Sequence, residues 1–351
     1  MSDAPAVPHP SLASPPIQFE QRIYARSPFG TLLTTALLFA LLFGSFVAVA
    51  TLEHVRVLDF AGRGFAFSDA SWPALVLSLL CCASLGMQRY ARLAEQRDAP
   101  AYARILAGGM ESAQGLTSLA PPDARLTRFT FYGIAIGIAI STFVRLRETA
   151  EGHPIPPGAT IWFALATTFL AVLFARGVEQ TRAGSRGYAR MLNAELKIDL
   201  LRTDTLTVLG RSAARSALIW LVVSAVACLF FLGNDLTGLT VGLIVACAGM
   251  GLGLFVSIMS RIHRQIADAK AAELEHVRGQ IDSMRAAMHE DHRAAQRLSG
   301  LIAYEKRIAD APEWPFDQST LMRIAAYILI PTVPWFGQAA AQYFVEHVAQ
   351  R

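Results

Sequence analysis

Residues Gly30–Leu52 read GTLLTTALLFALLFGSFVAVATL, a stretch without a charged side chain. A helix needs about 20 consecutive apolar residues to cross a bilayer, so this stretch predicts a transmembrane helix. It ends in Ala48-Val49-Ala50, which has the form of a signal-peptidase site. The apolar stretch exceeds the usual length of about 7–15 residues for a cleaved signal. We therefore expect an uncleaved first span, with cleavage after Ala50 as the alternative.

Further apolar runs follow along the chain and predict five more spans. They are Ala70–Met87, Phe129–Val144, Ala159–Ala175, Ser216–Leu232 and Leu239–Met259. The whole chain of 351 residues is 53% hydrophobic and 17% charged, whereas a soluble domain has about 25% charged residues. The expected fold class is therefore all-α, a polytopic transmembrane helical bundle of six spans.

The distribution of basic residues predicts the orientation. In order, the segments before and between the runs carry two, two, five (besides Arg128 at the run boundary), two, eight and no Lys or Arg, and Arg261–Arg307 carries nine. Cytoplasmic segments carry the excess of basic residues, so the N-terminus is expected in the cytoplasm. Because the basic residues cluster beside apolar runs, lipid rather than nucleic acid is the expected partner. The arginine-rich composition is typical of a GC-rich genome, and we expect a bacterial inner membrane.

Four regions are expected. Residues 1–29 are a Pro-rich, disordered cytoplasmic tail, and residues 30–259 are the transmembrane domain with two helical cytoplasmic loops (88–128 and 176–215). Residues 260–310 form one long cytoplasmic helix. Residues 311–351 contain the linker EWPFD and an apolar segment broken by prolines. Residues 321–345 are interpreted as a seventh span, a re-entrant pair or an interfacial helix.

The long helix carries an apolar stripe with 3–4–3–4 spacing, which is typical of a coiled coil. Ala295, Leu298 and Ile302 continue the phase. An exposed stripe in water needs a partner, so residues 274–302 predict a homo-oligomer, a partner protein or packing on the loop helices. The stripe begins with Leu274, Val277, Ile281, Met284 and Met288.

The tripeptide Tyr-Ala-Arg occurs four times and begins at Tyr24, Tyr90, Tyr102 and Tyr188. The first two tyrosines lie within a few residues of a span and are interpreted as interfacial anchors. The other two occupy matching positions in the two cytoplasmic loops, which indicates a loose two-span repeat. Trp314 and Phe316 in the EWPFD linker are likewise expected to anchor the chain at the membrane face.

The sequence contains no recognisable catalytic or cofactor-binding motif. His289 and His292 have a spacing that can share a metal, but two imidazoles alone make an incomplete site. The cores of the six runs lack charged residues and histidine, which argues against a proton-coupled transporter. We expect a non-enzymatic scaffold, sensor or assembly component that acts through its cytoplasmic helices. The alternative is a channel or uncoupled permeation path, which would need converging hydroxyls: Ser78, Ser141, Thr142, Thr167, Thr168, Ser224 and Ser257.

Overall fold

The protein is an all-α bundle in the computed structural model, apart from one short β-hairpin. The structure describes residues 19–61, 64–68, 70–112, 123–152, 156–195, 199–201, 203–233, 238–287 and 292–314, together with 322 and 326. The expected disordered tail lies outside the described residues only up to residue 18, because Phe19–Arg26 form a helix whose Glu20 and Tyr24 side chains are buried. The segment 321–345 is described only at residues 322 and 326 and stays a prediction.

Six helices in the described residues are long and apolar enough to cross a membrane, which confirms the six expected spans. They are α2 (Thr31–Leu52), α3 (Ser71–Ile105), α5 (Asp123–Ala150), α6 (Pro157–Glu195), α7 (Thr207–Ala227) and α8 (Gly238–Ala287). Helix α1 (Phe19–Arg26) precedes them and α9 (His292–Ala309) follows them. Strands β1 (Leu58–Ala61) and β2 (Gly64–Phe67) pair antiparallel between α2 and α3. The 3-10 turns η1 (Thr203–Leu206) and η2 (Cys228–Gly233) flank α7.

Local sequence explains where two of the long helices begin. The Ser68 hydroxyl accepts a hydrogen bond from the Ser71 amide at 3.3 Å, and the Ser68 carbonyl accepts from the Ser71 and Trp72 amides, so free amides at the start of α3 are satisfied. The Glu53 carboxylate, which follows α2, accepts hydrogen bonds from the Gly158 and Ala159 amides at 2.5 and 2.8 Å. A carboxylate at a helix N-terminus satisfies free amides and complements the helix dipole. Glu53 therefore joins the end of α2 to the start of α6.

The helices differ in how deeply they are buried in the bundle. About half of the apolar window is buried in α3 and α7, at 56% and 50%, but only 11% in α2, α5 and α8. Helices α3 and α7 are therefore central, and the outer helices turn large apolar side chains such as Leu32, Phe131 and Val245 outwards. Such a surface is suited to lipid.

Helices α5 and α6 approach each other most closely at two glycines. A Cβ atom added to Gly133 would lie 2.5 Å from the Val172 Cα, and one added to Gly137 would lie 2.4 Å from the Thr168 Cα. Small residues allow such close approach between membrane helices. The glycines of the third span are therefore packing residues.

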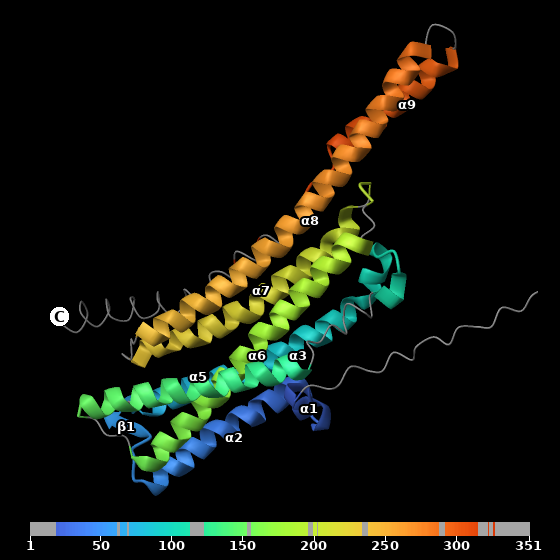
Figure 1. The fold of residues 1–351 in the computed structure, drawn as a ribbon. Helices are drawn as coiled ribbons and strands as arrows, with labels where there is room; N and C mark the ends of the chain where they lie inside the picture. The colour runs from blue at the N-terminus through green and yellow to red at the C-terminus, as the bar shows by residue number, and fades with distance from the viewer. Residues whose placement is uncertain are drawn as a thin grey trace, which may run out of the picture.

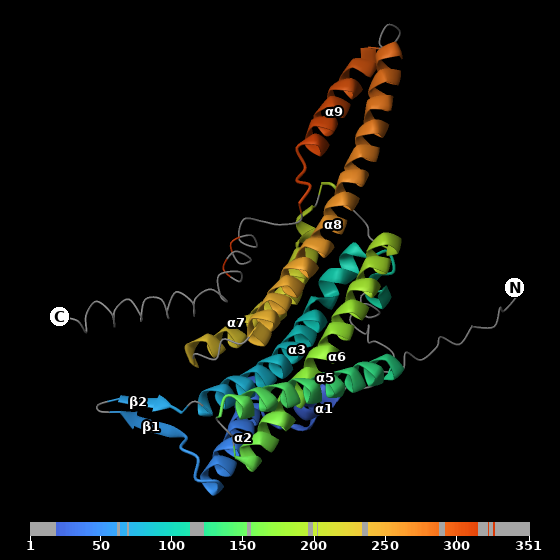
Figure 2. The same ribbon diagram turned by 60° about the vertical axis from the view of Figure 1, so that its left-hand side comes forward.

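The expected cytoplasmic helices differ from the sequence-based division in two ways. Much of the loops 88–128 and 176–215 consists of uninterrupted continuations of α3 and α6. The single helix expected over 260–310 is instead a hairpin, because α8 ends at Ala287 and α9 runs back along it (Figures 1 and 2). Folding back buries apolar residues of both helices, such as Val277 and Ile308, against one another, which a single helix in water could not do.

Candidate functional site

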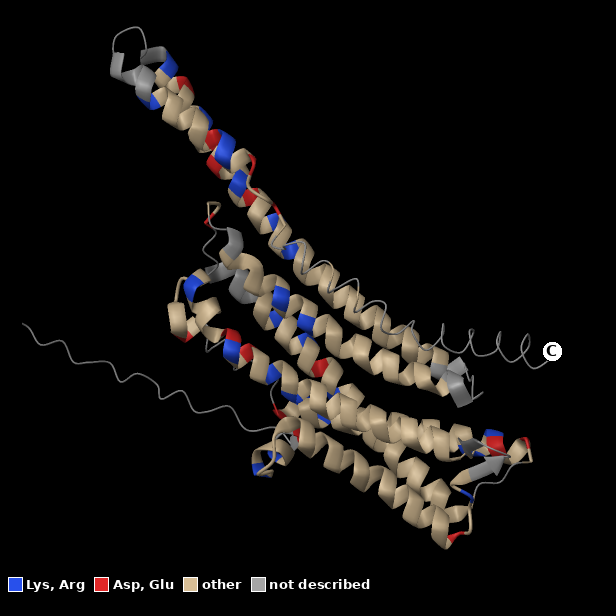
Figure 3. Ribbon diagram, turned by 180° about the vertical axis from the view of Figure 1, so that it is seen from behind, with Lys and Arg blue, Asp and Glu red and all other residues tan. Residues whose placement is uncertain are grey.

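The charged side chains gather at one end of the bundle. Figure 3 shows Lys, Arg, Asp and Glu concentrated where α3 and α6 end and along the α8–α9 hairpin, while the spans between are nearly free of them. We call this the charged end; the β1–β2 hairpin lies at the opposite end (Figure 2). The asymmetry agrees with the arginine distribution along the sequence.

A cavity of about 190 Å³ lies between α3, α6, α7 and α8 towards the charged end. Its polar side is lined by Gln88, Arg92 and Glu95 of α3 and Gln180 of α6. Further along α6 and α7, towards the opposite end, its walls become apolar. Phe174 and Trp220 are part of this wall, and their rings meet edge to face with centroids 5.2 Å apart. The cavity is therefore amphipathic.

The two loop tyrosines meet at this cavity. Tyr102 of α3 and Tyr188 of α6 line it and belong to one buried cluster, with exposed fractions of 1% and 8%. Neither phenol oxygen has a hydrogen-bond partner of normal geometry, although the Ser212 hydroxyl lies near Tyr102. Unpartnered buried hydroxyls are uncommon because leaving them unsatisfied costs about 1–3 kcal/mol. This pair therefore marks the cavity as a candidate site.

One ion pair lies beside the cavity, next to the lining residue Ser216. Arg215 of α7 donates through Nη2 to Asp98 of α3, and the two side chains are only 13% and 15% exposed. The other terminal nitrogen of Arg215, Nη1, is buried without a hydrogen-bond partner. Glu95 lies within electrostatic range of both Arg215 and Arg92. Charges of both signs therefore meet here: Glu20 and Arg89 also lie within electrostatic range of Arg92.

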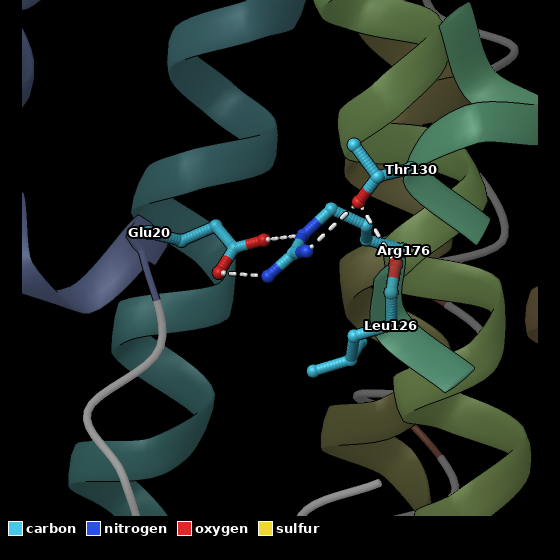
Figure 4. A network of polar contacts seen from close by, with 4 residues as sticks. All are labelled: Glu20, Leu126, Thr130 and Arg176. Atoms are coloured by element: carbon cyan, nitrogen blue, oxygen red, sulfur yellow. Dashed lines mark hydrogen bonds and ion pairs between the residues drawn. The ribbon is translucent and has the colours of Figure 1, made fainter. Parts of the chain in front are cut away.

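A second buried network attaches α1 to the bundle. Arg176 of α6 pairs with Glu20 of α1 through Nε and also donates through Nη2 to Oε2 at 3.2 Å (Figure 4). Arg176 Nη1 donates to Thr130 Oγ1 of α5 at 3.0 Å, and Thr130 donates to the Leu126 carbonyl at 2.8 Å. The Glu20 side chain is only 2% exposed. Paired charges of this kind are tolerated in a low-dielectric interior because each one neutralises the other.

The α8–α9 hairpin gives the apolar stripe an intramolecular partner. Val277 is 2% exposed, and Leu274, Ile281 and Met284 are partly buried. Polar contacts cross the same interface: Arg278 Nε lies 2.7 Å from Glu305 Oε1, and the Tyr304 hydroxyl donates to Glu273 Oε1 at 3.0 Å. The structure therefore places these stripe residues opposite α9.

The segment after α9 returns to the base of the hairpin. Trp314 stacks on His263 of α8 with ring centroids 4.2 Å apart. Lys270 Nζ donates to the Ala311 carbonyl at 3.0 Å and lies 3.2 Å from Glu313 Oε1. Trp314 thus has a docking partner within the protein, while its 47% exposure leaves part of the ring outside.

The anchor tyrosines have different environments. Tyr24 is 6% exposed, and its hydroxyl lies 3.0 Å from the Thr35 hydroxyl, so its ring packs inside the protein. Tyr90 is 46% exposed, as an interfacial anchor would be.

Met288, His289 and Phe316 lie outside the described residues, and of His292 only the backbone is described. In the part of the chain that the structure describes, no three His, Cys, Asp or Glu side chains could share a metal ion.

Sequence reasoning missed the charged part of this site. Glu20, Arg92, Glu95, Asp98 and Arg215 do not stand out in the sequence because charged residues beside a span are usually solvated or face headgroups. One signal was available: Arg92, Glu95 and Asp98 follow each other at intervals of three, which places them near one another on a helix.

Comparisons with models of protein families, with curated proteins and with solved structures found no match to this chain.

Proposed function

We propose that the protein is a non-enzymatic scaffold or sensor of a bacterial inner membrane, which acts through the α8–α9 hairpin on the cytoplasmic side. The observation that carries this proposal is the length of α8, which runs unbroken for 50 residues. At 1.5 Å per residue it measures about 75 Å, of which a bilayer core accounts for about 30 Å. Helix α8 therefore connects the membrane domain directly to a projecting arm, defined here as residues 261–287 and α9.

The outer side of the arm has the character of an interaction surface. Glu275, His276, Gly279, Gln280 and Ser283 form a shallow, exposed depression on α8. The inner side of α8 in the arm already contacts α9. The outer side can therefore contact a partner while the hairpin stays folded. This supports a scaffold or sensor whose arm contacts another protein.

The placement of the hydroxyls gives little support to the alternative, a channel. Ser78 and Ser224 are buried and donate to carbonyls, Ser78 to Ala74 of its own helix and Ser224 to Ile244 of α8. Thr142 and Ser257 are exposed on outer helices and donate to carbonyls of their own helices. Thr142 and Ser257 therefore do not face the same interior as Ser78 and Ser224, whereas a polar pore would need its hydroxyls to converge.

Site-specific photo-crosslinking in native membranes tests the scaffold proposal. A photoreactive residue at Gln280 or Ser283 should give a discrete protein adduct, whereas one at Val245, which is 65% exposed on the apolar part of α8, should not. Absence of an adduct at both arm positions would contradict the proposal. Ion flux through vesicles that contain the purified protein, above that of empty vesicles, would favour the channel instead.

Cysteine labelling tests the orientation on which the proposal depends. The four native cysteines are buried, so a membrane-impermeant maleimide should report on introduced cysteines. Ala150→Cys at the opposite end should react in intact spheroplasts, and Ser283→Cys should react only after the membrane is opened. The reverse pattern would place the arm outside the cytoplasm.

A further inference from the structure

We propose that the cavity between α3, α6, α7 and α8 binds a small neutral amphiphile whose head group presents hydrogen-bond-accepting oxygens, as in a quinone or an ester. This inference goes beyond the role proposed for the arm and does not depend on it. It gives a role to the buried phenol groups of Tyr102 and Tyr188, for which the role proposed for the arm provides none.

The first argument is the set of hydrogen-bond donors that lack an acceptor. The phenol groups of Tyr102 and Tyr188 line the cavity, and neither oxygen has a hydrogen-bond partner of normal geometry, although the Ser212 hydroxyl lies near Tyr102. Arg215 Nη1, which can only donate, is also unpartnered and lies within electrostatic range of both phenols. A ligand with carbonyl-type oxygens in the cavity would satisfy the two phenols, which line it; Arg215 lies beside the lining residue Ser216.

The second argument is charge. Arg215 is already paired with Asp98, and Glu95 lies close to both Arg215 and Arg92. An added anion would meet two carboxylates in a buried setting, where an uncompensated charge is costly. A head group without net charge fits this balance better than a phosphate or a carboxylate.

The third argument is shape. Leu173, Phe174, Trp220 and Val223 form the apolar wall, so the ligand should carry an apolar portion. Two glycines of α6 leave room: nothing lies within 4 Å of a Cβ added to Gly184, and one added to Gly177 would make only ordinary contacts. The volume of about 190 Å³ matches roughly six waters at about 30 Å³ each, enough for a ring-sized head group.

Thermal unfolding of the purified full-length protein in detergent, with a decyl-substituted benzoquinone as the probe, tests this inference. We expect the probe to raise Tm by at least about 3 °C at saturation, because a ligand that binds only the folded state stabilises it. Decanoate and inorganic phosphate, as anionic comparisons, should give less than half of this shift.

Two kinds of variant locate the effect. The double variant Tyr102→Phe/Tyr188→Phe removes only the two hydroxyls, and Gly184→Val adds apolar bulk to the cavity lining at a position where an added Cβ has nothing within 4 Å. Each should lose at least half of the probe-induced shift, while Tyr90→Phe, an exposed tyrosine, should retain it. The proposal is overturned if the two cavity variants keep the full shift, if decanoate or phosphate stabilises more than the quinone, or if no probe raises Tm.

Discussion

The contact between α5 and α6 offers a sharp test of the membrane core. In Gly137→Ala, the new Cβ would lie 2.4 Å from the Thr168 Cα, whereas ordinary contacts begin at 3.4 Å. Backbone atoms cannot rotate away, so α5 would have to move by about 1 Å and lose packing along its length. Overpacking of this kind costs about 1–3 kcal/mol.

A matched control separates packing from helix propensity. Gly253 lies on the exposed face of α8, and nothing lies within 4 Å of a Cβ added there. Gly253→Ala gains the same propensity of up to about 1 kcal/mol without a clash, so it should be neutral or slightly stabilising. The difference between the two variants therefore isolates the cost of the close approach, about 1–3 kcal/mol.

Reversible unfolding by SDS in mixed micelles, followed by far-ultraviolet circular dichroism, measures this difference. We expect Gly137→Ala to unfold at a lower SDS fraction than the wild type and Gly253→Ala to unfold at the same or a higher one. Equal unfolding curves for the two variants would refute the close packing of α5 on α6.

Three further changes test the rest of the structure. Ile281→Asp should separate α9 from α8, which would appear as faster hydrogen exchange in α9 while the native mass stays unchanged. A lower oligomer mass would instead show that the stripe packs between two copies of the chain. Arg176→Ala leaves the Glu20 carboxylate buried without its partner, which should lower the free energy of unfolding by about 3–5 kcal/mol. Trypsin should therefore cleave α1 faster than in the wild type, and an unchanged cleavage rate would contradict the network. The hydrogen bond to Glu273 raises the pKa of Tyr304 above its usual value near 10. The stabilisation of the folded protein by this hydrogen bond is therefore full below pH 10 and is lost as the pH rises through the raised pKa. Ultraviolet titration of the wild type against Tyr304→Phe measures the pKa, and a midpoint at the usual value would contradict the hydrogen bond.

The sequence predicted the spans well because membrane insertion depends on local composition. Gly30–Leu52 became α2 with almost unchanged bounds, since a charge-free run of this length can satisfy its backbone in lipid only as a helix. The third span proved longer than its apolar run: α5 covers Asp123–Ala150 because a helix continues beyond the bilayer until a breaker stops it. The breaker here is Gly152, whose φ of +79° ends the helical path.

The sequence also predicted that residues 274–302 need a partner, but it could not say which one. A stripe at heptad spacing packs equally well against a second copy or against a helix of the same chain. The structure provides α9 of the same chain, whose own apolar residues, such as Ile308, face α8. The choice depends on the direction in which α9 runs relative to α8, and spacing along one helix carries no information about that.

The cavity shows the limit of sequence reasoning most clearly. Tyr102 and Tyr188 stand out in the sequence as copies of one tripeptide, yet the sequence places them only at matching positions in two loops. Their meeting depends on α3 and α6 lying side by side, and the Asp98–Arg215 pair joins residues 117 positions apart.

The sequence alone determined that the chain is a six-span helical membrane protein, because hydrophobicity and helix length act locally and do not depend on the neighbours of each helix. Only the tertiary structure decided which helices are central, that α9 folds back on α8, and that two buried tyrosines share a cavity. Those features depend on which helix faces meet, and that is set by close contacts such as Gly137 on Thr168 between residues distant in the chain.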